Sequence, residues 1–108
     1  MTYLVGDEVK IPSDCVNIAI VDAYDDEQIY CWVECLGNEF YEVKSVNYLG
    51  KKVSFVGFES VDDNNLVAVY KWKNKKEKAP LSEIEFIKPT KLQKLWIEGY
   101  NLWKSYRP

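Results

Sequence analysis

Apolar and polar residues alternate along most of the first 87 residues, in runs interrupted by residues typical of turns. Such alternation indicates strands with one buried face. It predicts seven strands, near Asp7–Ile11, Asn17–Tyr24, Gln28–Cys35, Glu39–Val46, Lys52–Glu59, Leu66–Lys73 and Ser82–Ile87. The turns between them are short, so the sheet should be mainly antiparallel.

The pattern changes to a helical period after Pro89. Thr90 is a suitable N-cap, and the apolar residues after it recur at spacings of three and four: Leu92, Leu95, Trp96, Gly99, Trp103 and Tyr106. This predicts one amphipathic helix at about residues 90–106. We expect its apolar face to pack on the sheet as part of the core, with a partner groove or a dimer contact as the alternative.

Length and composition fit a single domain over residues 1–108. The chain is 47% hydrophobic and 15% aromatic, which is typical of a folded globular protein, and its length leaves little for a second core. The fold class that we predict is mainly β: an antiparallel sheet or SH3-like barrel of about six to seven strands between about residues 4 and 87, followed by the C-terminal helix.

Two segments carry a resemblance to a known fold. The start of the chain, Val5-Gly6-Asp7-Glu8-Val9-Lys10-Ile11, resembles the first strand of SH3-like small β-barrels of the Tudor and KOW types, in which Gly-Asp precedes a strand. Ala79-Pro80-Leu81-Ser82-Glu83-Ile84-Glu85 is similar to the closing strand of some Tudor-like modules. The resemblance covers about the first 90 residues and implies a curved barrel that binds rather than catalyses. It transfers no binding residues, since no complete family motif is matched.

Groups that carry enzyme chemistry are scarce. The chain has no histidine, no glycine-rich phosphate loop and no Gly-x-Gly-x-x-Gly motif, so we predict neither catalytic residues nor a cofactor. Cys15, Cys31 and Cys35 are an odd number without histidine partners, and we expect free thiols and no metal site. An enzyme with an unrecognised carboxylate site, built from turn acids such as Asp25 or Asp62, is the third functional alternative.

The sequence also bears on location. No stretch is long and apolar enough to span a membrane, and residues 1–12 do not resemble a signal peptide. An odd number of cysteines is typical of a reducing compartment. We therefore expect a cytoplasmic protein without a membrane partner.

Charge is distributed unevenly along the chain. Residues 1–70 hold 13 acidic and 4 basic side chains, whereas residues 71–108 hold 10 basic and 4 acidic ones, within a net charge of −3. The basic part begins with a lysine-rich segment that contains Lys71, Lys73, Lys75, Lys76 and Lys78. These lysines either keep a loop soluble or bind phosphates, so nucleic-acid binding by residues 71–108 is one hypothesis. The single arginine and the pI near 5.0 count against it.

One predicted strand carries a candidate contact surface. In Gln28–Cys35, alternation puts Tyr30, Trp32 and Glu34 on the face opposite the core residues. Aromatic residues beside an acid are typical anchors of a protein interface, unless the C-terminal helix or a second sheet covers them.

We therefore favour a non-enzymatic module that binds another macromolecule, in the first place a protein. Its size and composition also suit a small accessory or inhibitor protein of the type that phages encode. Self-association is a further alternative, because the acidic and basic parts complement each other.

Overall fold

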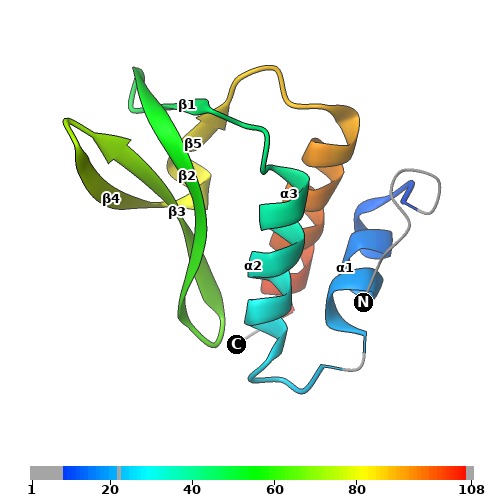
Figure 1. Ribbon diagram of the computed structural model, residues 1–108. Helices are drawn as coiled ribbons and strands as arrows, with labels where there is room; N and C mark the ends of the chain where they lie inside the picture. Colours follow the sequence, from blue (N-terminus) through cyan, green and yellow to red (C-terminus); the bar gives the residue numbers. More distant parts are fainter. Residues whose placement is uncertain (1–8, 22, 107–108) are drawn as a thin grey trace.

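The computed structural model describes residues 9–21 and 23–106, which form a curved five-stranded sheet and three α-helices on one side of it (Figure 1). The elements in chain order are α1 (Pro12–Ile20), α2 (Gln28–Glu39), β1 (Ser45–Tyr48), β2 (Lys51–Asp62), β3 (Asn65–Trp72), β4 (Lys75–Pro80), the one-turn 3-10 helix η1 (Leu81–Glu83), β5 (Ile84–Phe86) and α3 (Lys91–Ser105). Neighbouring strands are antiparallel, in the order β4-β3-β2-β1-β5.

The sheet is not closed into a barrel. β4 and β5 form its two opposite edges, which corrects the expectation of a barrel and of six to seven strands for the described residues. The register of β2 against β3 shifts between Phe55 and Gly57, and such an irregularity bends a strand and increases its twist. On one side of this bend the inner face of the sheet packs against the helices through Phe58 and Leu66, and on the other side Val53 and Tyr70 belong to a second, smaller core.

Several expected elements are confirmed. β2, β3 and β5 overlap the predicted strands Lys52–Glu59, Leu66–Lys73 and Ser82–Ile87, and α3 is the predicted C-terminal helix. Thr90 caps α3 as expected, because its hydroxyl accepts a hydrogen bond from the Gln93 amide at 3.0 Å. Only Ser45 and Val46 of the fourth predicted strand are in a strand, and β4 was expected to be a loop.

The strands expected at Asn17–Tyr24 and Gln28–Cys35 are wrong, because both segments contribute to helices. In α2 the buried residues recur at helical spacing: Ile29, Trp32, Cys35 and Leu36. The same segment also alternates between apolar and polar residues, so its pattern fits both periods. Burial of the large Trp32 ring, which a strand would have turned away from Ile29, accounts for the helix.

The first predicted strand, Asp7–Ile11, is not found at the residues that the structure describes. Val9 and Lys10 are not in a strand, and α1 begins at Pro12, a residue well suited to the first turn of a helix. The Asp14 carboxylate accepts hydrogen bonds from the backbone amides of Lys10 and Ile11, at 2.9 and 3.1 Å, which fixes this start. Residues 1–8, with most of the segment that resembles an SH3-like first strand, lie outside the described residues.

The helices form the larger core around Trp32. Its ring centroid lies 5.7 to 6.0 Å from those of three α3 residues: Trp96, Tyr100 and Trp103. The Tyr100 hydroxyl also accepts a hydrogen bond from the Leu66 amide at 3.2 Å, which ties α3 to β3. Tyr106, expected on the buried stripe, is instead 73% exposed. Figure 1 shows that the β3–β4 hairpin extends away from these helices.

Candidate functional site

A cleft of about 100 Å³ lies on the inner face of the sheet, between the β1–β2 turn and the β3–β4 hairpin. We call it the aromatic cleft, and it is lined by Tyr48, Leu49, Lys51, Val53, Tyr70 and Trp72. The ring centroids of Tyr48 and Tyr70 are 5.0 Å apart, with their planes at 34°. Tyr70 is buried, Tyr48 is half-buried and Trp72 is 40% exposed, so Trp72 is the most accessible ring of the cleft.

Two tight turns position these rings. The β1–β2 and β3–β4 hairpins close with the two-residue turns Leu49-Gly50 and Lys73-Asn74. All four of these residues have positive φ, between 50° and 80°, as the type I′ turns of hairpins require. Glycine and asparagine adopt this conformation readily, but leucine and lysine do not. Each of the two turns therefore holds one residue, Leu49 or Lys73, whose own backbone preference does not favour the turn.

Three lysines lie on the same side of the sheet as Trp72. The Nζ atoms of Lys51 and Lys73 lie 5.4 and 5.8 Å from the centroid of the Trp72 ring, within the range of a cation–π interaction. Lys75 is directly opposite Trp72 in the β3–β4 pairing, so its side chain projects from the same face. The aromatic cleft is thus bordered by positive charge from two hairpins.

The other lysines of the predicted segment are directed elsewhere. Lys71 and Lys76 pair with each other across β3 and β4 and project from the outer face of the sheet. The Lys78 ammonium is bound to the Glu59 carboxylate at 3.0 Å. The structure therefore brings two of the five predicted lysines to the aromatic cleft and adds Lys51, which sequence reasoning missed.

The aromatic cleft also has an acidic neighbour. Glu77 is opposite Tyr70 in the β3–β4 pairing and projects from the inner face. Burial is the main cause that raises the pKa of Tyr70, and the nearby Tyr48 and Glu77 add to it. The Tyr70 hydroxyl is therefore neutral at physiological pH, and the charge around the aromatic cleft comes from the lysines and Glu77.

The three residues predicted as protein-binding anchors do not form one surface. Trp32 is 0% exposed, so the expectation that it lies on an open face is wrong. The reason is the helix: residues two positions apart point in nearly opposite directions on α2, whereas they share a face on a strand. Tyr30 is 61% exposed and Glu34 is exposed, and their role in binding stays a prediction.

A second groove, of about 140 Å³, lies between α1 and α2. It is lined by Ile18, Ala19, Val21, Cys31, Glu34, Cys35 and Asn38. The thiols in and near it are free, and burial raises the pKa of Cys35 to about 11 and that of Cys15 to about 12. Protonated thiols are poor nucleophiles and poor metal ligands. Within residues 9–21 and 23–106, no three histidine, cysteine or acidic residues gather in a way that could hold a metal ion.

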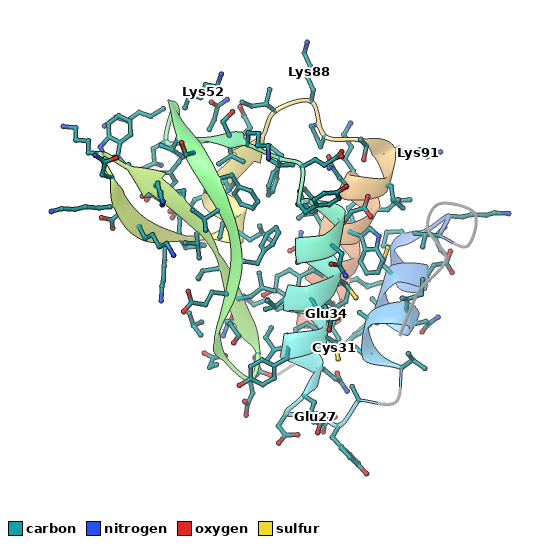
Figure 2. All side chains as sticks on the ribbon, in the orientation of Figure 1. Glu27, Cys31, Glu34, Lys52, Lys88 and Lys91 are labelled. Carbon is teal, nitrogen blue, oxygen red and sulfur yellow. The ribbon has the colours of Figure 1, made fainter. Side chains whose placement is uncertain are left out.

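Charge is segregated in space as well as along the sequence. Figure 2 shows Lys52, Lys88 and Lys91 at one end of the molecule, with Glu27 and Glu34 toward the other. β2 crosses this distance, because it begins beside the aromatic cleft and ends at the acidic β2–β3 turn, which Figure 1 shows close to the start of α2. The aromatic cleft belongs to the basic end.

Comparison of the chain with protein-family models, with curated proteins and with solved structures found no match. In the described part of the chain, no helix has the length and apolarity needed to cross a membrane.

Proposed function

We propose that this protein is a non-enzymatic binding module that holds a nucleic acid at the aromatic cleft. The observation that carries the proposal is the placement of lysines beside the partly exposed ring of Trp72. Lysines neutralise phosphates, and an exposed indole ring stacks on a base of any type. A polyanion with planar bases uses both kinds of contact at once.

The net charge of −3 is compatible with this function, because it includes acids such as Glu27 and Glu34 that lie toward the other end of the molecule, whereas Glu77 and Glu83 act on Tyr70 at the aromatic cleft. β2 is 12 residues long, so the acidic turn at its end lies on the order of 30 Å from Lys51. At physiological salt, exposed charges are screened over about 8 Å. Repulsion between a bound phosphate backbone and this turn is therefore weak.

The connectivity of the sheet supports a binding role. β1 to β4 form a meander, and η1 then leads into β5, which pairs with β1. The segment that resembles a Tudor-like closing strand, residues 79–85, covers the end of β4, η1 and the first two residues of β5. The likeness supports the use of the curved face as a ligand surface, by analogy of fold alone.

Two double variants of one hairpin test the proposal. Lys73→Glu with Lys75→Glu changes the side of the aromatic cleft, and Lys71→Glu with Lys76→Glu makes the same change of charge on the outer face. We expect the first pair to weaken binding of a labelled oligonucleotide about tenfold or more at about 0.1 M salt, and the second pair by less than about threefold. Fluorescence anisotropy measures both affinities.

Two results would contradict the proposal. One is an unmodified protein that binds neither single-stranded nor duplex oligonucleotides, and the other is an equal loss in the two double variants, which would indicate only long-range attraction. As a further check, replacing one phosphate-binding lysine by glutamine should lower the slope of log affinity against log salt by about 0.7 to 0.9.

A protein partner is the second proposed function, and the exposed part of α2 favours it. Tyr30 is 61% exposed on this helix, and Glu34 borders the groove between α1 and α2. An apolar side chain of a partner fits such a groove, with Glu34 beside it for a basic group. Co-purification of one stoichiometric protein that is lost with Tyr30→Ala, but retained in the Lys73 and Lys75 double variant, would reverse the order of the two functions.

A further inference from the structure

We infer that the nucleic acid is single-stranded and that one of its bases enters the aromatic cleft to stack on Trp72. This inference rests on the proposed function and goes beyond it by naming the class of nucleic acid. The inference depends on stacking of a base on Trp72, whereas the proposed function depends first on phosphate binding by the lysines.

The position of the rings is the first argument. Tyr70 is 8% exposed and forms part of the smaller core, so it serves as the floor of the aromatic cleft, and Trp72 presents the accessible ring. The two hairpin turns border this space. In a duplex, each base is paired and its faces are covered by its neighbours. A base that has left such a stack has a free face to lay on Trp72, whereas a base inside a duplex does not.

The second argument is what now occupies the face of the Trp72 ring. The Lys51 and Lys73 ammonium groups lie 5.4 and 5.8 Å from its centroid, and lysine is a point charge on a flexible stem. An incoming base takes the place of an ammonium group over the ring, and the displaced group moves to a flanking phosphate. Base stacking on Trp72 and phosphate binding by the displaced lysine then occur together, because the lysine and the ring are in contact before binding.

The third argument is the shape of the basic surface around the aromatic cleft. Lys51 and Lys75 approach Trp72 from different strands, and Lys73 stands in the turn between β3 and β4. The charges therefore flank one ring, from β2 on one side, from β4 on the other and from the turn at the end of the hairpin. A chain of linked phosphates that bends around one inserted base matches this arrangement, and a stiff duplex does not.

The experiment compares three ligands of about 12 nucleotides, a length within the range that single-strand binding domains cover. They are a single strand of thymidylate, a duplex of the same length, and an abasic strand that has the phosphates without bases. We expect the unmodified protein to bind the thymidylate strand about tenfold more tightly than either of the others at equal salt. Tryptophan fluorescence should change on binding, since Trp32, Trp96 and Trp103 are at most 2% exposed and Trp72 is the accessible indole among the described residues.

Two substitutions of Trp72 separate stacking from bulk. Trp72→Leu keeps an apolar side chain without a ring, and we expect it to weaken binding of the thymidylate strand about fivefold or more while binding of the abasic strand is unchanged. Trp72→Tyr keeps a ring and should retain most of the affinity. Circular dichroism verifies that both variants are folded. If Trp72→Leu is unstable, the tryptophan fluorescence of the unmodified protein still decides the question, because stacking should change it with the thymidylate strand and not with the abasic strand, and an equal change with both would contradict stacking.

The outcomes distinguish phosphate binding at the aromatic cleft from insertion of a base. Failure to bind any of the three ligands overturns the proposed function and this inference with it. Equal affinity for the duplex, the abasic strand and the thymidylate strand, unaffected by Trp72→Leu, overturns only the inserted base, because phosphate binding then remains. Loss of affinity for all three ligands in the Lys73 and Lys75 double variant supports the proposed function in either case.

Discussion

At the scale of single residues, Leu49 and Lys73 occupy a backbone conformation that their side chains disfavour, with φ of 50° and 54°. A non-glycine residue in this region costs on the order of 1 kcal/mol. Leu49 is also 72% exposed, so burial of its side chain does not offset that cost. Leu49 lines the aromatic cleft, the Lys73 ammonium lies 5.8 Å from the Trp72 ring that also lines it, and Lys88 has a similar φ of 48°.

The strain at Leu49 can be relieved by one substitution. Leu49→Asn creates an Asn-Gly pair, the preferred sequence of a type I′ turn, and should raise the free energy of unfolding by about 0.5 to 1 kcal/mol. Urea denaturation measures the change as a higher midpoint with an unchanged slope. Leu49→Ala is the control, because it removes the same side chain and keeps the unfavourable φ. An Asn variant no more stable than the Ala variant would contradict this account.

Buried thiols make stability depend on alkaline pH. Burial raises the pKa of Cys15 from about 9 to about 12 in the folded protein. A group whose pKa is higher in the folded state stabilises that state fully below the pKa of the unfolded chain, near 9, and this contribution is lost as the pH rises toward 12. We expect urea midpoints to fall from about pH 9 upward, and to fall less in Cys15→Ala. An identical pH dependence in the two proteins would contradict the assignment to Cys15.

At the scale of elements, α1 packs closely on α3 at Gly99. A Cβ atom at Gly99 would lie 2.7 Å from the Cβ of Cys15 and 2.9 Å from the backbone oxygen of Pro12. Gly37, in α2, has nothing within 4 Å of the same position. Alanine should therefore have opposite effects at these two helical glycines: it has room at Gly37 and none at Gly99.

Alanine at each of these glycines gives a matched pair. Gly37→Ala should stabilise the protein by up to about 1 kcal/mol, because alanine is the better helix former. Gly99→Ala gains the same helix preference but forces α1 away from α3, and should destabilise by about 1 to 3 kcal/mol. Thermal unfolding of both variants checks the signs. Similar shifts in the same direction would mean that α1 does not pack closely at Gly99.

The sequence predicted α3 and the strands β2, β3 and β5 because each has one period and clear ends. α2 has two periods, since its β-branched and apolar residues alternate and also recur every three or four positions. Packing of Trp32 against α3 decides between them, and that contact joins residues more than 60 positions apart in the chain. Local pattern alone carries no information on such a contact.

Part of the aromatic cleft could be predicted from the sequence, and the rest depends on strand pairing. The lysine-rich segment and Trp72 are visible in the sequence, but Lys51 reaches Trp72 only through the pairing of β1, β2 and β3. The Leu49-Gly50 turn was a usable signal, because a two-residue turn places Lys51 opposite Tyr48. The two-residue turn Lys73-Asn74 pairs Lys75 with Trp72 and Lys76 with Lys71, so the hairpin places Lys75 and Lys71 on opposite faces once β4 is known to be a strand.

At the scale of the whole molecule, the larger core is separate from the aromatic cleft. The larger core is built around the helices, with three of the four tryptophans at most 2% exposed, whereas the fourth is at the end of β3. Substitutions of exposed lysines around the aromatic cleft should therefore leave the helical core intact. This separation is what allows the hairpin variants to be interpreted as changes in affinity rather than in folding.

The segregation of charge has a consequence for how copies of the protein would sit on a long polymer. If the proposed function is right, each bound copy would direct the end with Lys52 inward and the end with Glu27 toward the solvent, so all copies would share one orientation. On a nucleic acid covered in this way, the outer surface would carry the carboxylates of the protein in place of the phosphates. Its coat would repel other nucleic acids and attract cationic proteins, at a distance from the bases that remain shielded beneath it.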